Sequence, residues 1–261
     1  ADMFLMQKLA RTRLLFVKRD VVAAATCTAL VGCVLLFFLG VAVAAEQEGR
    51  CTGPSEVAVV YEDASELDAA CRAVADVRGY FAGIGLEVPS KLAVHFADRA
   101  GADYKGHATA HGYFDPLRSL VVIYRLSDTE PWKQSWSPQL LGSFMRHEIV
   151  HLAVWEVLQG SSRQLRREWH EFIAYALQLD MMNPDLRQRI LTAYADIDPA
   201  KDLAEINEFS YGMNPQVFAV MAFKTYRHRG AAEFVRRLLN AEIIPPPFSY
   251  PFAVQPHEVQ R

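Results

Sequence analysis

The sequence predicts an α+β protein in which a small N-terminal sheet, with one helix, precedes a helical half. Short runs rich in Val, Ile and aromatic residues are confined to residues 56–126, where they alternate with polar positions as strands do. From Ser137 onward, apolar residues instead recur at helical spacing between asparagine, proline and glycine boundary signals. The length of 261 residues suits one such domain, or two small lobes, after a targeting segment.

A targeting segment is predicted over residues 1–45. Five basic residues come before an uncharged apolar run from Val21 to Ala45, whose 25 residues exceed the ~20 that span a bilayer. The run ends in Ala42-Val43-Ala44, which resembles a signal-peptide cleavage site, so both an uncleaved transmembrane anchor and a cleaved signal peptide fit. In either case we expect the remainder to lie in the cell envelope, membrane-anchored or periplasmic.

We expect residues 46–55 to be a linker and residues 56–261 to be the folded domain. This domain divides into a sheet lobe (56–136), a helical lobe (137–243) and a proline-rich tail (244–261). Of the 27 basic and 30 acidic residues, 5 and 2 precede residue 46, which leaves 22 and 28 and a formal charge of −6. Without a basic patch, this charge argues against nucleic-acid binding.

The sheet lobe should hold three strands and one helix: Glu56–Asp63, a helix capped by Ser65 that ends near Gly83–Gly85, Lys91–Phe96, and Ser119–Leu126. The glycine-rich segment 100–116 is expected to be a loop. Its His107 and His111 are interpreted as loop residues, with a position in the wall of a cleft as the alternative. Cys51 and Cys71, the cysteines that follow the targeting segment, are expected to form a disulfide.

The helical lobe should begin at Ser137-Pro138, an N-cap followed by a first-turn proline, and its first helix should stop near Gly160. Asn183-Pro184 and Asn214-Pro215 repeat this start signal, and Gly230 is the predicted stop of the second of these helices. A last helix is expected over 231–240. The three prolines 245–247 favour an extended tail, which we expect to pack on the domain; service as a partner ligand is the alternative.

The stretch Met145–Leu152 contains the pattern His-Glu-x-x-His. Residues four apart lie on one helical face, so His147 and His151 can reach the same metal ion. Catalytic zinc usually has three protein ligands, and Glu171, which follows the motif after nineteen intervening residues, supplies the third. Glu148, adjacent to a ligand, is the candidate general base. The sequence therefore predicts a Zn²⁺ site at the junction between sheet and helices.

This ligand pattern resembles that of gluzincin metallopeptidases, the thermolysin-like arrangement of two His and one Glu. The helix around Trp169, Glu171 and Ala174 also resembles the peptidase-MA-like group, although Phe172 stands where that group usually has Gly. Tyr175 stands where thermolysin-like enzymes carry an acid that supports a ligand histidine. From about residue 55 onward, the chain also resembles an uncharacterised bacterial family of envelope-targeted proteins.

The resemblance implies a zinc metallopeptidase that acts on a peptide or protein substrate outside the cytoplasmic membrane. It also implies that the strand before the metal-binding helix is a sheet edge, so Val121–Arg125 is the expected substrate-binding strand. Tyr211, expected in a loop before a helix, is the first candidate for stabilising the oxyanion, with His228 and His170 as weaker ones. Two alternatives remain: an inactive metal-binding or structural protein on a peptidase scaffold, and a membrane-anchored assembly factor that acts through its tail.

Overall fold

The computed structural model describes residues 45–52, 56–88, 91–98, 111–125, 129–161 and 164–247, which all belong to one compact unit. The predicted anchor or signal peptide, apart from Ala45, lies outside these residues, as does the tail beyond residue 247. Within the described ranges, no helix combines the length and the apolar character needed to cross a membrane.

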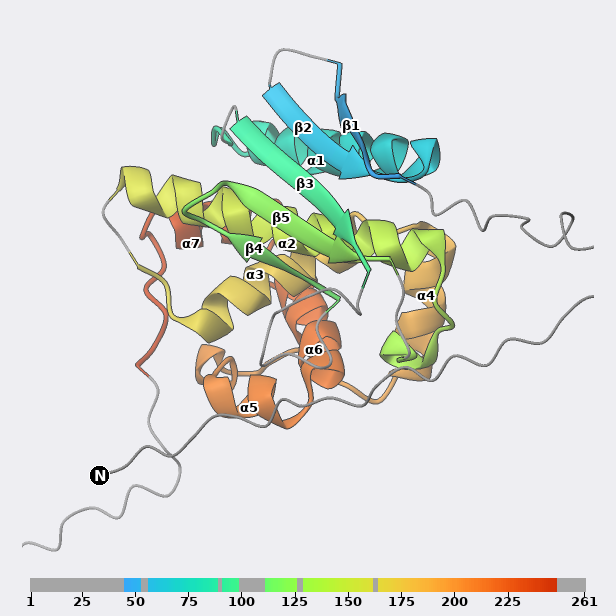
Figure 1. Ribbon diagram of the computed structural model, residues 1–261. Coiled ribbons are helices and arrows are strands. Elements are labelled where there is room, and N and C mark those ends of the chain that lie inside the picture. Colours follow the sequence, from blue (N-terminus) through green and yellow to red (C-terminus); the bar gives the residue numbers. More distant parts are fainter. Residues whose placement is uncertain are drawn as a thin grey trace, which may run out of the picture. The chain divides into compact units, whose positions relative to one another are not determined.

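A five-stranded mixed sheet forms the N-terminal part, in the order β1-β2-β3-β5-β4 (Figure 1). Three central strands run parallel: β2 (Glu56–Tyr61), β3 (Lys91–Ala97) and β5 (Leu120–Tyr124). The two edge strands, β1 (Gln47–Arg50) and β4 (Gly112–Asp115), are each antiparallel to their neighbour. The expected α+β class, with a small N-terminal sheet followed by helices, is therefore confirmed.

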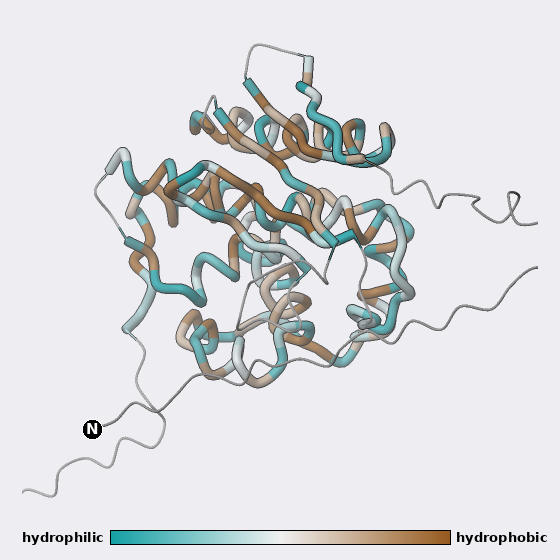
Figure 2. The backbone as a smooth tube through the Cα atoms, viewed as in Figure 1, coloured by the Kyte–Doolittle hydropathy of each residue, from teal (hydrophilic) through white to brown (hydrophobic). Residues whose placement is uncertain are grey.

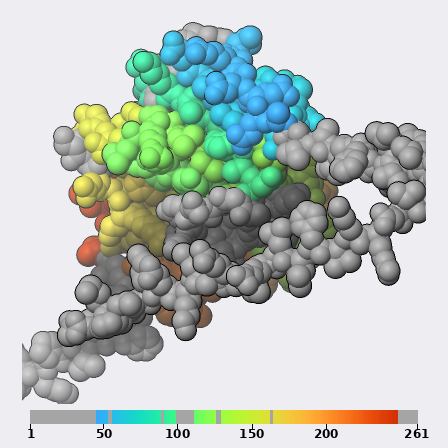
Figure 3. Space-filling model, viewed as in Figure 1, coloured from blue at the N-terminus to red at the C-terminus, as the bar shows by residue number. Residues whose placement is uncertain are grey.

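Two long helices cover one face of this sheet: α1 (Ala64–Gly83) and α2 (Pro138–Gly160), seen behind the strands in Figure 1. The alternation of β3 explains the choice of face, because Leu92, Val94 and Phe96 point into the core while the residues between them are only half-buried. Figure 2 shows the apolar residues concentrated along β2 and β5. The opposite face of the sheet contributes to the surface in Figure 3, coloured blue to green.

The helical half comprises α3 (Arg167–Asp180), α4 (Pro184–Ala193), α5 (Glu208–Met213), α6 (Pro215–His228) and α7 (Ala232–Leu239), with 3₁₀ turns η2 (Pro131–Lys133) and η3 (Leu203–Glu205). Asn183 and Asn214 cap α4 and α6 through their side chains, as predicted. A hydrophobic core continues from the sheet into these helices, so the two halves pack as one body.

Several predicted boundaries and assignments were wrong. Residues 46–55 are not merely a linker, because Gln47–Arg50 forms β1 and pairs with β2. The presumed loop 100–116 contains β4, which pairs with β5. Consequently β5 is an interior strand, bonded on both sides, and cannot be the sheet edge that was expected at Val121–Arg125. Both missed strands have four residues, too few for alternation to stand out.

Smaller differences concern helix ends. The N-cap of α1 is Asp63 rather than Ser65; its carboxylate accepts the Ser65 backbone N–H at 2.7 Å, and Glu66 completes a capping box. Helix α2 extends through Gly160, because this glycine keeps helical geometry and Ser161 is the C-cap.

The predicted disulfide between Cys51 and Cys71 is present, with the two Cα atoms 5.3 Å apart. It joins the chain just after β1 to helix α1, so the edge strand is held covalently to the helix beneath it. The start of the tail also packs as expected: the Arg166 guanidinium donates a hydrogen bond to the Pro246 carbonyl.

Candidate metal centre

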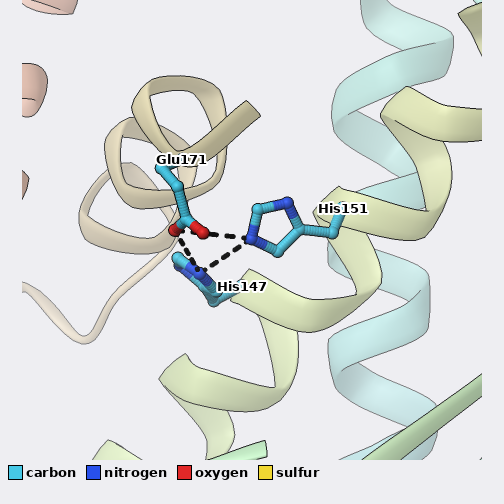
Figure 4. A group of neighbouring side chains, drawn as sticks. All are labelled: His147, His151 and Glu171. Carbon is cyan, nitrogen blue, oxygen red and sulfur yellow. Dashed lines mark hydrogen bonds and ion pairs between the residues drawn. The ribbon is translucent and has the colours of Figure 1, made fainter. Parts of the chain in front are cut away.

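Helices α2 and α3 bring the three predicted ligands together (Figure 4). His147 and His151 lie one turn apart on α2, and their Nε2 atoms are 3.0 Å from each other. Glu171 approaches from α3, with Oε2 at 3.5 Å from His147 Nε2 and 3.6 Å from His151 Nε2. All three side chains are largely buried. The predicted set therefore converges on one point.

These distances fit a zinc ion. With bonds of ~2.0–2.1 Å, neighbouring ligand atoms of a tetrahedral site stand roughly 3.3 Å apart. The three observed separations lie around that value, and two imidazoles plus one carboxylate are a donor set that catalytic zinc uses. Among the described residues, this is the one group of three or more His, Cys, Asp or Glu whose ligand atoms converge.

The surroundings of the second ring nitrogen of His147 differ from those usual for a metal-binding histidine. A metal-binding histidine generally donates its second ring N–H to a carboxylate, a carbonyl or water. Here Nδ1 of His147 is buried and has no hydrogen-bond partner among the residues that the structure describes. The Tyr175 ring lies against His147 instead, with centroids 4.4 Å apart. A ring contact thus occupies the place where thermolysin-like enzymes carry an acid.

Phe172, the other departure from the peptidase-MA-like pattern, points into the core. It is fully buried between Trp169 and Phe234, with ring centroids at 5.4 and 5.9 Å. It does not line the candidate site, so the large side chain at this position leaves the ligands undisturbed.

Glu148 lies beside the ligand set without belonging to it. Burial raises the pKa of its carboxyl to about 7, an effect that the charge of His151 opposes and that of Glu171 adds to. For Glu171, burial also favours the protonated form, but the charge of His151 and hydrogen bonds from both histidines hold its pKa well below the ordinary value. The pKa values of the two acids are thus shifted in opposite directions: Glu148 suits proton transfer, and Glu171 suits metal ligation.

A cavity of about 860 Å³ opens next to these residues, between the sheet edge and the helices. Strand β4 forms one wall, and its Phe114 ring stacks on His151 at a centroid distance of 5.4 Å. Helices α2, α3 and α5, the first turn of α6, the turn η2 and neighbouring loop residues form the remainder. The residues that line the cavity from the sheet edge and η2 are His111, Gly112, Tyr113, Phe114, Pro131 and Trp132.

Trp132, which lines the cavity, has an unusual backbone conformation. Its φ of 51° lies in the left-handed region, which a bulky residue rarely adopts without support. Gln216 supplies that support. Its side-chain oxygen accepts a hydrogen bond from the Trp132 backbone N–H at 3.0 Å, and its backbone carbonyl accepts one from the indole N–H at 3.2 Å. Phe144 stacks on the indole at 5.5 Å, so this side of the cavity is aromatic.

Tyr211 also lines the cavity, although it lies in helix α5 and not in the predicted loop. Burial, followed by the charge of Glu171, raises the pKa of its hydroxyl to about 12. The phenol therefore keeps its proton at neutral pH and can donate it in a hydrogen bond. The structure thus brings Tyr211 to the ligand set, as the sequence hypothesis required.

Two of the other histidines, His170 and His111, line the cavity, and His228 does not. His170 lines the cavity, and burial lowers its pKa to about 4, so it is neutral there. His111 lines it as well, with its ring tilted against that of Phe144 at a centroid distance of 4.0 Å, which agrees with the alternative interpretation of that residue. His228 is exposed at the end of α6, away from the cavity lining. His107 lies outside the described residues.

Gly112, Trp132 and Arg167 are among the site residues that the sequence analysis did not single out. Their positions in the cavity wall follow from the approach of separate elements, which no local sequence signal encodes.

Fold and site together define an α+β protein with a candidate His-His-Glu metal centre in a cleft. A family model, described as a family of unknown function (DUF6639), matches residues 57–246, and the chain belongs to this family. Comparison with curated proteins and with solved structures gives no match. The matched range starts in β2 and ends beyond α7, so it includes every residue of the candidate centre.

Proposed function

We propose that the protein is a zinc-dependent metallohydrolase, and specifically a peptidase. The observation that carries this proposal is the convergence of His147, His151 and Glu171 at the wall of a cavity that Glu148 also lines. Purely structural zinc sites usually have four protein ligands, whereas three ligands beside a cavity are typical of a catalytic site.

A bound zinc ion would lower the pKa of a water molecule and polarise a carbonyl group. Glu148 would accept a proton from the attacking water and pass it to the leaving amine, because its raised pKa suits both transfers near neutral pH. Tyr211 would donate a hydrogen bond to the oxyanion that develops on the substrate carbonyl. Its contact with Glu171 keeps the phenol close to the reacting centre.

Strand β4, and not β5, is the sheet-edge strand that borders the cavity. It borders the cavity with Gly112, Tyr113 and Phe114, whereas β5 is enclosed by β3 and β4. A substrate in this cavity would therefore contact β4 on one side and helices α3 and α5 on the other.

We place the proposed activity in the cell envelope. A disulfide between Cys51 and Cys71 is typical of exported proteins, since cytoplasmic reductants keep such thiols reduced. The basic and apolar residues before position 46 support the same location, by anchor or by signal peptide.

A second candidate function is metal binding without turnover. The specific observation in its favour is the unpartnered Nδ1 of His147, since loss of such a contact typically lowers metal affinity or activity 10–100-fold. Under this alternative the scaffold binds zinc and recognises peptides but does not cleave them.

The deciding experiment is metal analysis of the full chain, purified in detergent, followed by digestion of a peptide library. Stoichiometric zinc, with cleavage that a chelator abolishes and added zinc restores, is the expected result. Zinc without cleavage of any peptide would favour the second candidate. Absence of zinc would overturn both and favour a metal-independent assembly factor.

A further inference from the structure

Arg167 brings a positive charge into the candidate cleft. It is the first residue of α3 and lies four positions before Glu171, so both side chains occupy one face of the helix. It lines the cavity, and its guanidinium carbon is 5.2 Å from the centroid of the Tyr211 ring.

This charge has no acidic partner within the part of the chain that the structure describes. The neighbouring Arg166, by contrast, pairs with Glu168 at 3.0 Å. Among the described cavity-lining residues, Arg167 is the single Lys or Arg, and the two acids, Glu148 and Glu171, are assigned to proton transfer and to the metal. The guanidinium thus keeps donors that neither Tyr211 nor a neighbouring carboxylate uses.

We propose that Arg167 binds a carboxylate of the substrate and makes the cleft selective for peptides that carry one near the reacting bond. This inference rests on the proposed function and names its substrate class. A planar guanidinium binds carboxylates through two parallel hydrogen bonds, and Arg167 is exposed at the cleft, so a ligand can reach it. Both a C-terminal carboxylate and an Asp or Glu side chain offer this chemistry.

Arg167 has one competing role, which is to hold Tyr211 in place by the cation–π contact. A residue that only positions Tyr211 would affect all peptides alike. A residue that binds substrate would affect only those with the carboxylate, so paired peptides separate the two roles.

The test measures peptide binding to the zinc-loaded full chain carrying Glu148→Gln, which removes cleavage from the readout. One pair of peptides differs only in a free or amidated C-terminus, and a second series differs only in Glu or Gln at each position. We expect at least one carboxylate peptide to bind about tenfold or more tightly than its neutral twin. The pair that shows the difference identifies the source of the carboxylate.

Adding Arg167→Gln should abolish this preference, and Arg167→Lys should retain part of it. Arg118 is an exposed arginine in the turn between β4 and β5, so Arg118→Gln is the charge-matched control and should leave the preference intact. Equal affinity for both members of every pair, preference that survives Arg167→Gln, or no binding of any carboxylate peptide would overturn the inference. Selective binding without cleavage by the wild-type chain would instead overturn only the proposed peptidase function.

Discussion

Gly112 on strand β4 lies directly against Glu148 on helix α2. A methyl group built on Gly112 would stand 3.1 Å from the Glu148 Cγ atom and 2.5 Å from the Val122 carbonyl oxygen. The edge strand therefore approaches the candidate base so closely that only a hydrogen atom fits between them. This contact buries Glu148 and forms part of the cavity wall.

Gly112→Ala should therefore destabilise the protein and reduce hydrolysis. The added methyl group must displace backbone at Val122, and overpacking of this kind typically costs ~1–3 kcal/mol. The same shift of β4 would change the surroundings of Glu148. Chemical denaturation and steady-state cleavage measure the two effects.

Gly79→Ala provides the matched control, because Gly79 is exposed within α1 and a methyl group there meets nothing within 4 Å. Alanine in such a helical position should stabilise the protein by roughly 0.5–1 kcal/mol. If Gly112→Ala proved as stable and as active as the wild type, the close approach of β4 and α2 would be refuted.

Replacing both Cys51 and Cys71 by Ser should lower the free energy of unfolding by about 3 kcal/mol on the chain-entropy model. The bridge spans 20 residues, and its loss gives the unfolded chain more freedom while β1 loses its covalent link to α1. Urea titration under oxidising conditions measures the change. Wild-type protein with reductant should behave like the double variant; equal stability with and without reductant would show that the bridge contributes nothing.

The ligand set could be predicted because its geometry is local. Two histidines four apart share a helical face whatever the rest of the fold does, and the buried faces of α2 and α3 bring Glu171 to them. The helix starts at Asn183 and Asn214 were predictable for the same reason, since a capping side chain bonds amides two and three residues away.

The walls of the cleft could not be predicted in this way. β1 and β4 owe their structure to backbone pairing with strands distant in the sequence, and four residues carry little alternation of their own. Gly112 has its role only because β4 meets α2, and Arg167 only because α5 places Tyr211 beside it. These relationships arise from tertiary packing, which a single sequence does not display.

Glu171→Ala should weaken zinc binding at least ~10-fold, because two imidazoles alone leave the ion under-coordinated. Competition with a fluorescent chelator measures the affinity. Glu156→Ala on α2 removes an acid that neither lines the cavity nor ligates, so its zinc affinity should be unchanged. Full affinity in Glu171→Ala would place the third ligand elsewhere and end the His-His-Glu assignment.

Tyr211→Phe should lower kcat by ~10²–10³-fold, the usual loss when one oxyanion donor is removed. The phenylalanine ring preserves packing against Phe218, whose centroid lies 5.4 Å away, so stability and zinc content should stay near wild type. Steady-state kinetics with zinc analysis separates these quantities. An unchanged kcat would exclude Tyr211 as the donor and direct attention to His170, which also lines the cavity.

Glu148→Gln separates the catalyst from the ligands. The amide preserves the shape of the buried side chain beside Gly112 but cannot accept and return a proton. We expect near-normal zinc content, since Glu148 is not among the converging ligand atoms, and a loss of turnover of at least ~10²-fold. Metal analysis and peptide cleavage on the same sample measure both.

Two outcomes of the Glu148→Gln experiment would contradict the proposed mechanism in different ways. Loss of zinc would make Glu148 a ligand or a structural acid, and the observed spacing of the three ligand atoms would then describe an incomplete site. Unchanged hydrolysis by zinc-replete variant protein would assign the activity to another site. Because Glu171→Ala should weaken zinc binding and Glu148→Gln should not, the pair of variants distinguishes loss of the ion from loss of the base.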